Sequence, residues 1–442
     1  MGKTTVSLGL MGALVKKGLV VQPFKAGPDF IDPSYHTWIC GRASRNLDSY
    51  LLSRKKLVKI FARAAAKADI SIIEGMMGLF DGLRNFRAST AEVARIIGAP
   101  VVLVADAWST STSLAAQLVG YRTIDRRLKV VGVILNKVAN TAHRKACEEA
   151  IKRFAGLRTI GALPYDPSIN LPERHLGLVP TREDARKEAM RDIVKLVWEN
   201  VDLDAVIELA TNASPLQYAA DLGEPQIASK RINVAVAYDE SFNFYYQDGL
   251  DELVRAGANL EFFSPTHDND LPADTCGVYI GGGFPEFHAA QLAENSSMRN
   301  TIKKVGEQGL PILAECGGMM YLGDTLKSLD GTAFPMVKLF DFSVEMTQKL
   351  TLSYVLAESV ERSLLLRRGG RVVGHEFHRS VVTQLASDTR FSYRLIRGTG
   401  FGNGLDGAVV HNVLATYMHT HFSSKPSMAA AFVTSAKRHS RR

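Results

Sequence analysis

The chain has 442 residues, of which 46% are hydrophobic and 22% charged, so it is long enough for two or three globular domains. No apolar run reaches the ~18 residues of a membrane span, and no apolar stretch with a cleavage site follows Met1. The net charge of +8 suits anionic ligands, whereas no basic stripe interleaved with aromatic residues indicates a nucleic-acid partner.

The four cysteines are far apart and form no Cys-x-x-Cys pair. This spacing argues against a structural zinc site and against a disulfide scaffold. It is typical of a reducing compartment, and we therefore expect a cytoplasmic protein. The lack of a spanning apolar run leads us to expect no membrane partner.

Gly2, Lys3, Thr4 and Thr5 open an amphipathic helix that should run to about Lys17. Gly-Lys-Thr before a helix is the end of a Walker A loop, where lysine reaches phosphate oxygens and threonine holds magnesium. The first glycine of that motif, its next four residues and the preceding strand are not in the sequence. Alone, so short a signal could arise by chance.

The following segments strengthen the phosphate-site interpretation. A strand from Leu19 leads into a polar loop, and a buried strand from Ile70 delivers Glu74 and then Asp81 to a glycine-rich loop. Carboxylates at such strand ends are natural magnesium ligands, although they could also be hydrogen-bonded turn residues. Further apolar strands at 100–106 and 130–136, separated by helical patterns, predict a parallel sheet.

The periodicity weakens after Val201, and turn-forming residues cluster between 212 and 224. We interpret residues 201–231 as a short helix and a linker. A new strand then begins near Asn233, and strands and helices alternate again.

A run from Pro311 to Glu315 reads as a buried strand, with Cys316 and then Gly317 and Gly318 directly after it. Strand, cysteine, tight turn and helix form a nucleophile elbow. A helix N-terminus behind the sulfur would favour the thiolate. The competing interpretation is a buried structural thiol.

Possible partners for this thiol come from two other segments. His419 and His421 follow a strand near the C-terminus, and either imidazole could activate the sulfur. Three glycines at 281–283 end another strand. They could leave backbone N–H groups free to bind an oxyanion, or they could simply form a tight turn. The alternation of His375, Glu376 and His378 is not a zincin motif, and we disfavour zinc there.

Four strings occur in the same order as in a known family: 279–286, 314–322, 374–380 and 413–422. They resemble the cobyrinate a,c-diamide synthase family, which includes the sirohydrochlorin and nickel-sirohydrochlorin a,c-diamide synthases. The C-terminal half is similar to its class I glutamine amidotransferase domain, and the N-terminal half to its dethiobiotin-synthetase-like P-loop domain. The resemblance covers nearly the whole chain.

The resemblance implies an α/β protein of two doubly wound parallel-sheet domains, at residues 1–200 and 232–442, joined by the linker at 201–231. It implies a Cys316–His419 dyad, with an oxyanion site at Gly283 and Gly317. His421 stands where class I amidotransferases carry a glutamate. In the first domain it implies nucleotide binding by Gly2, Lys3, Thr4, Thr5 and Asn136, magnesium binding by Thr4, Glu74 and Asp81, and substrate binding by Asp29, Phe30, Ile31 and Asp32.

The implied reaction is an ATP- and Mg²⁺-dependent amidation. Glutamine supplies ammonia, and an acyl phosphate forms on the a and c acetate carboxylates of a tetrapyrrole; a homodimer is compatible with this. Phe30 stands where many relatives carry a tyrosine, which removes a hydroxyl near the expected substrate. Nickel-sirohydrochlorin is an alternative substrate to cobyrinate, and the sequence does not separate the two. A non-catalytic or regulatory protein with a degenerate phosphate loop is the alternative from a different functional class.

Most phosphate contacts of a Walker A loop are made by backbone N–H groups of the loop. We therefore expect the sequence as written to bind ATP weakly and to be less stable than one extended by a strand and glycine-rich loop.

Overall fold

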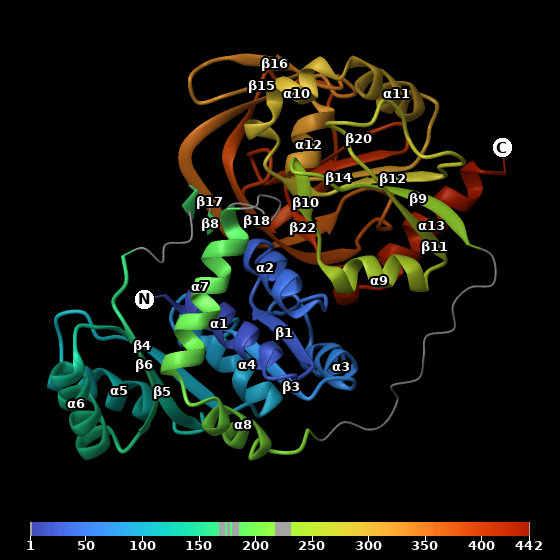
Figure 1. Cartoon of the computed structure of the whole chain (residues 1–442). Coiled ribbons are helices and arrows are strands. Elements are labelled where there is room, and N and C mark those ends of the chain that lie inside the picture. Colours follow the sequence, from blue (N-terminus) through green and yellow to red (C-terminus); the bar gives the residue numbers. More distant parts are fainter. Residues whose placement is uncertain (1, 168–172, 175–176, 179–184, 217–230, 442) are drawn as a thin grey trace. The chain divides into compact units, whose positions relative to one another are not determined.

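The computed structural model describes residues 2–167, 173–174, 177–178, 185–216 and 231–441 (Figure 1). It separates into two compact units, Met1–Gly223 and Glu224–Arg442. Both are α/β units built around parallel strands, and the second also has an antiparallel region; this confirms the predicted α/β fold class. None of the described helices combines the length and the apolar character needed to cross a bilayer.

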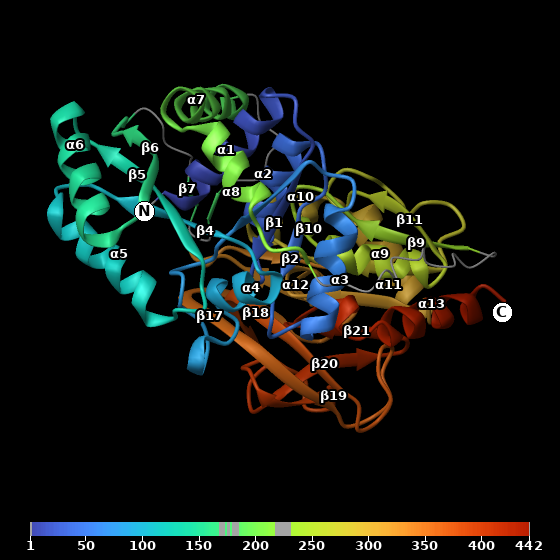
Figure 2. The ribbon, with the colours of Figure 1, turned by 90° about the horizontal axis from the view of Figure 1, so that it is seen from below.

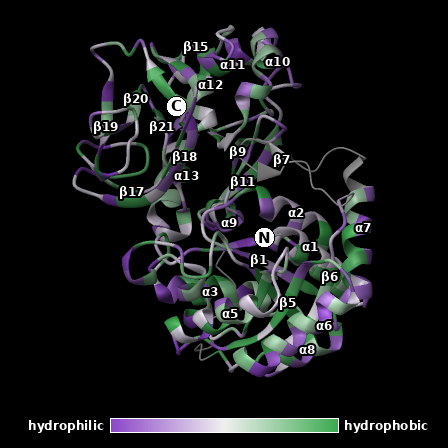
Figure 3. Cartoon of the chain, turned by 90° about the vertical axis from the view of Figure 1, so that its left-hand side faces the viewer, coloured by the Kyte–Doolittle hydropathy of each residue, from purple (hydrophilic) through white to green (hydrophobic). Residues whose placement is uncertain are grey.

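The first unit contains two three-stranded parallel sheets, in the orders β2-β1-β3 and β4-β5-β6. All residues of β1 and most apolar residues of β5 are buried, as parallel strands covered by helices require, whereas β3 and β4 are only partly buried; β5 is coloured strongly hydrophobic in Figure 3. The bounds are β1 Val21–Ala26, β2 Arg45–Leu47, β3 Ile70–Glu74, β4 Val101–Asp106, β5 Val130–Val138 and β6 Arg158–Pro164, with a short pair β7 Glu173–Arg174 and β8 Gly177–Leu178.

The first helix of this unit begins directly after Gly2, which adopts a left-handed conformation with φ of 80°. Gly9 lets this helix approach α7 closely, because a Cβ there would lie 2.4 Å from the Val197 side chain. The helices are α1 Lys3–Lys16, α2 Ile31–Cys40, α3 Arg54–Ala65, α4 Thr90–Ile97, α5 Thr112–Ile124, α6 Thr141–Ala150, α7 Ala185–Asn200 and α8 Leu203–Thr211.

The last of these helices lies inside the segment that we assigned to the linker. Leu203, Ala205 and Val206 of α8 are buried in the core of the first unit, because apolar side chains recur on one face of the helix. Residues 201–211 therefore belong to the first unit. Residues 217–230 of the proposed linker lie outside the described residues.

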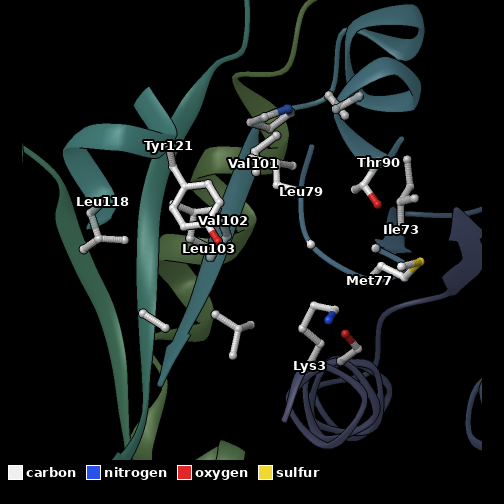
Figure 4. Close-up of a pocket in the computed structure, with 18 of the residues that line it drawn as sticks. Lys3, Ile73, Met77, Leu79, Thr90, Val101, Val102, Leu103, Leu118 and Tyr121 are labelled. Atoms are coloured by element: carbon white, nitrogen blue, oxygen red, sulfur yellow. The ribbon is translucent and has the colours of Figure 1, made fainter. Parts of the chain in front are cut away.

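β3 and β4 are not paired with each other, and a cavity of about 220 Å³ lies between them. Figure 4 shows Ile73 of β3 on one side, Val101 to Leu103 of β4 on the other, and Lys3 at the end of α1. The sequence pattern predicted one parallel sheet, whereas the described strands form two. The edges of β3 and β4 that face the cavity have no ladder partner among the described strands, so the centre of the predicted sheet is open.

The second unit is built on one twelve-stranded sheet. Its strands β11, β9, β12, β14 and β21 are parallel neighbours and carry the core. The bounds are β9 Ile232–Ala237, β11 Ala258–Phe263, β12 Gly277–Ile280, β14 Ile312–Glu315 and β21 Val413–Thr416, with a small antiparallel pair β10 Phe242–Phe244 and β13 Gly282–Gly283 beside them.

A largely antiparallel extension, in which one pair of strands is parallel, continues this sheet beyond β21 (Figure 2). The prediction of a doubly wound parallel-sheet domain did not include this extension, whose strands follow one another without the intervening helices that parallel crossovers need. Their bounds are β15 Thr325–Lys327, β16 Ala333–Pro335, β17 Ser343–Ser359, β18 Arg371–Thr383, β19 Arg390–Arg397, β20 Leu405–Val410 and β22 His419–Thr420.

The parallel part of the sheet is covered by helices, and two hydrophobic clusters fill the space on its faces. Phe432 of α13 and Leu253 of α9 belong to one cluster, and Met298 of α11 and Met319 of α12 to the other. The helices are α9 Gln247–Arg255, α10 Ala289–Glu294, α11 Ser296–Glu307, α12 Gly317–Leu322 and α13 Ser427–His439.

Candidate active sites

Cys316 lies in the sharp turn between β14 and α12, as the elbow interpretation predicted. Its backbone is strained, with φ of 49° and ψ of −105°, a region that non-glycine residues rarely occupy. The turn is held because the Cys316 amide donates to Thr416 O at 2.7 Å and the Gly318 amide donates to Gly281 O at 3.0 Å. Such a conformation persists only where its surroundings impose it, as they do at a nucleophile.

The glycine strand β13 packs directly against this elbow. A Cβ added to Gly317 would lie 3.1 Å from the Gly283 nitrogen and 2.9 Å from Pro285. The structure thus brings together the two predicted oxyanion residues, Gly283 and Gly317, next to the thiol.

The imidazole of His419 also lies against this glycine strand, at Gly282. A Cβ on Gly282 would be 2.3 Å from His419 Cε1, and the His419 ring stacks on His375 with centroids 4.9 Å apart. His421 lies further along, stacked on Tyr246 at 4.5 Å. Of the two histidines that the sequence left open, His419 is the one against the glycines that flank Cys316.

Burial keeps both members of this pair neutral. It lowers the pKa of His419 to about 3, with His378 contributing, so the imidazole is an available base at ordinary pH. Burial, together with the Glu286 carboxylate, raises the pKa of the Cys316 thiol. The expectation of a thiolate favoured by α12 is therefore wrong for this state, because a six-residue helix does not offset full burial.

In the first unit, Lys25 is the centre of the charged site. It is buried at the end of β1, and its ammonium contacts Glu74 at 3.0 Å, Asp29 at 3.5 Å and Asp32 more closely. Thr4 donates to Glu74 at 2.8 Å, and His36 contacts the other oxygen of Glu74 at 2.6 Å. Sequence reasoning missed Lys25 and His36; a single lysine inside the apolar strand Val21–Ala26 was the available signal.

The carboxylates in this cluster outnumber its buried ammonium. Burial, with Asp29 and Glu74 close by, raises the pKa of Asp32 to about 8. Burial acts in the same direction on Glu74, but Lys25 and His36 overcome it and lower the pKa of that group. The surplus of negative charge beside the Thr4 hydroxyl suits a hard divalent cation such as Mg²⁺.

The predicted metal ligands are only partly brought together. Thr4 and Glu74 are hydrogen-bonded, whereas Asp81 lies in an exposed loop, where it accepts from the Gly78 amide at 2.9 Å. Asp32, which we assigned to substrate, is the nearer carboxylate, at 3.5 Å from Thr4. In the described part of the chain, no three His, Cys, Asp or Glu side chains form a metal cluster by themselves.

The predicted nucleotide-binding residues gather at the N-terminus of α1. Lys3 lines the cavity between β3 and β4, and burial, followed by repulsion from Lys25, lowers its pKa. Asn136, at the C-terminal end of β5, lies against Gly2, where a Cβ would approach its amide nitrogen to 2.4 Å. Thr5 occupies the first turn of α1 and is half-buried.

The predicted substrate residues form the loop that starts α2. Asp29 accepts from the Ile31 and Asp32 amides, at 2.8 and 3.3 Å, and so holds the first turn of the helix. Phe30 is the half-buried N-cap residue, and Ile31 points into the core. Asp29 and Asp32 therefore face the Lys25 cluster, while Ile31 has a packing role.

Known protein families match both parts of the chain. A family described as "CobQ/CobB/MinD/ParA nucleotide binding domain" matches residues 1–179, and one described as "CobB/CobQ-like glutamine amidotransferase domain" matches residues 233–427. Among curated proteins, "Cobyrinate a,c-diamide synthase" of Methanosarcina barkeri is 40% identical over 99% of this chain and 94% of its own length. The protein of the same name from Listeria innocua is 42% identical over 99% of this chain and 97% of its own length.

The chain belongs to the cobyrinate a,c-diamide synthase family. This membership confirms the predicted enzyme class, an ATP-dependent ligase of the glutamine amidotransferase type. Among solved structures, "PurLQS from Thermotoga maritima" matches 47% of this chain with 13% identity and a TM-score of 0.36, a likeness too weak to support an argument.

Replacing Lys25 tests the cluster in this family member. Lys25→Met keeps the length of the side chain but leaves buried carboxylates without their ammonium, and we expect a loss of about 3–5 kcal/mol in unfolding free energy of the first unit. Lys137→Met is the matched control, because Lys137 pairs with Asp106 at 2.9 Å with both side chains about one-third exposed; its loss should be at most ~1 kcal/mol. Urea unfolding measures both, and equal losses would contradict the assigned role of Lys25.

Proposed function

We propose that this enzyme amidates the a and c acetate side chains of cobyrinate, using ATP and glutamine. The observation that carries the proposal is the strained elbow at Cys316 beside Gly283 and Gly317, with His419 against the neighbouring Gly282, in a chain that matches synthases of this name over nearly its whole length. A thiol in this setting performs acyl transfer, and glutamine hydrolysis is the acyl transfer that releases ammonia.

In the glutaminase half-reaction, Cys316 attacks the carboxamide carbon of glutamine. His419 takes the thiol proton and passes it to the departing ammonia, since it is neutral and lies beside the glycine strand. The amides of Gly283 and Gly317 stabilise the oxyanion. Water then cleaves the thioester and releases glutamate.

In the synthetase half-reaction, a substrate carboxylate attacks the γ-phosphorus of ATP, the bond to the β,γ-bridging oxygen breaks, ADP leaves, and the carboxylate becomes an acyl phosphate. Ammonia then displaces phosphate and leaves an amide. Lys3 and the amides at the start of α1 bind phosphate oxygens, and Asn136 contacts the adenine. Thr4 and Glu74 would hold Mg²⁺, with Asp81 and Asp32 as further carboxylates; the metal supplies neutralisation of the phosphate charge.

Isotope transfer tests the whole sequence. With heavy nitrogen in the amide of glutamine, the label should appear in two amides of the tetrapyrrole product. With heavy oxygen in the substrate carboxylates, label should appear in inorganic phosphate, as an acyl phosphate requires. Cobyrinate and nickel-sirohydrochlorin are compared side by side; preference for the nickel compound would replace the proposed substrate, and unlabelled phosphate would refute the intermediate.

Glu74→Gln tests the assignment in the first unit. We expect ammonia-dependent amidation to fall by about 100-fold or more, because the buried carboxylate that pairs with Lys25, Thr4 and His36 is neutralised. Glutamine hydrolysis by the second unit should be unaffected. Full amidation activity in this variant, measured with ammonium salt as nitrogen source, would show that Glu74 is not part of the site.

A further inference from the structure

Glu315, the residue before Cys316, is a buried carboxylate that the mechanism above does not use. It ends β14 and is 1% exposed. One of its oxygens, Oε1, accepts from the Thr420 amide at 3.0 Å and from the Thr420 hydroxyl more closely. The other, Oε2, accepts from the Tyr279 hydroxyl at 2.8 Å. Three donors thus converge on one carboxylate in the core.

Thr420 is the residue next to His419, and its strand needs this support. β22 contains only His419 and Thr420, and among the described strands it pairs with β18 alone, through Gly374 and His375. Two residues on one ladder give little resistance to fraying. The hydrogen bonds that Thr420 donates to Glu315 attach β22 to β14, in the central part of the sheet.

We propose that Glu315 is a positioning residue for glutamine hydrolysis, and that it fixes His419 relative to Cys316 through the amide and hydroxyl of Thr420. The inference rests on the proposed function of Cys316 and His419. It assigns to Glu315 the orienting role that a glutamate two residues after the histidine has in class I amidotransferases, a place that His421 occupies here.

Glu315 and Thr420 are the sequence neighbours of Cys316 and His419, and this explains how their hydrogen bonds can position the two catalytic residues. Glu315 is bonded to the nucleophilic residue, and Thr420 is bonded to the base, so one pair of hydrogen bonds closes a short path from Cys316 to His419. Burial raises the pKa of Glu315 to about 7, and the Thr420 and Tyr279 bonds oppose that rise. Loss of the link would leave both catalytic residues present but misaligned, and a misplacement of about 1 Å can cost ~100-fold in rate.

Two substitutions separate positioning from stability, because each removes one hydroxyl donor from Glu315. Thr420→Val removes one of the two bonds to the His419 strand and leaves the amide bond, whereas Tyr279→Phe removes a bond to β12, which carries neither Cys316 nor His419. We expect Thr420→Val to lower kcat for glutamine hydrolysis by about 10- to 100-fold with KM unchanged. Tyr279→Phe should lower the unfolding temperature similarly but change kcat by less than ~3-fold, and Thr420→Ser should restore kcat.

Glu315→Gln is a second variant that keeps the volume and one acceptor, and its kcat should fall by about 3- to 10-fold, also with KM unchanged. Wild-type kcat in Thr420→Val or Glu315→Gln, or equal losses in Thr420→Val and Tyr279→Phe, would overturn the positioning role. Ammonia-dependent amidation should stay at the wild-type level in every variant. Retained glutamine hydrolysis in Cys316→Ser would instead refute the proposed function, so the two failures are distinguishable.

Discussion

Cys316→Ser is expected to abolish glutamine-dependent amidation while leaving ammonia-dependent amidation intact. The glutaminase step requires a thiol nucleophile at the elbow, and serine in the same strained position is a far weaker one. Loss of a nucleophile from such a site typically removes about 10⁴-fold or more of the rate. The synthetase step takes ammonia directly and does not use this residue.

The measurement compares amide formation with glutamine and with ammonium salt as nitrogen source. Cys276→Ser is the matched control, because Cys276 is another free thiol of the second unit, half-buried and hydrogen-bonded to Asp274 O at 3.3 Å. It should behave like the wild type with both nitrogen sources. Glutamine-dependent amidation that survives in Cys316→Ser would move the nucleophile elsewhere.

The elbow could be predicted from the sequence because its determinants are local. An apolar strand, Cys316 and two glycines allow little but a sharp turn, and the positive φ of Cys316 agrees with that pattern. The adjacency of Gly283, Gly317 and His419 also agrees with the family order of motifs, although it depends on tertiary packing.

Contacts between distant, individually ordinary residues could not be predicted. Lys25 reads as one lysine in a strand, and only the fold places it among Asp29, Asp32 and Glu74. Glu315 likewise reads as the end of a strand, and its bond to Thr420 spans 105 positions of sequence. Hydrophobic periodicity carries no information on such pairings.

Asp406 illustrates the same limit in the second unit. It is fully buried in β20 and accepts from the Thr416 hydroxyl at 2.7 Å and from the Tyr417 and Met418 amides at 3.0 and 3.3 Å. It therefore shapes the chain that leads from β21 to His419. No sequence motif indicates how the strands of the antiparallel extension pair. Neither this pairing nor the contacts of Asp406 were therefore predicted.

His419→Ala should cost far more glutaminase activity than His421→Ala. His419 lies against Gly282, beside the glycines that flank Cys316, whereas His421 packs on Tyr246. Loss of a general base typically costs 10²- to 10⁴-fold (about 3–5 kcal/mol of barrier). His421→Ala should mainly lower stability, through the lost packing of a fully buried ring, and should change kcat by less than ~10-fold.

The pH dependence gives this comparison a second readout. A histidine can no longer act as a base once the pH falls below its pKa and the imidazole is protonated. Burial lowers the pKa of His419 to about 3. Glutamine hydrolysis should therefore not decline between roughly pH 8 and pH 6, where an ordinary histidine with a pKa of ~6.5 would become protonated. Steady-state hydrolysis across this range, with ammonia-dependent amidation as the control for folding, checks both statements. Comparable losses in the two alanine variants, or a decline centred near pH 6.5 that disappears in His421→Ala, would transfer the role of base to His421.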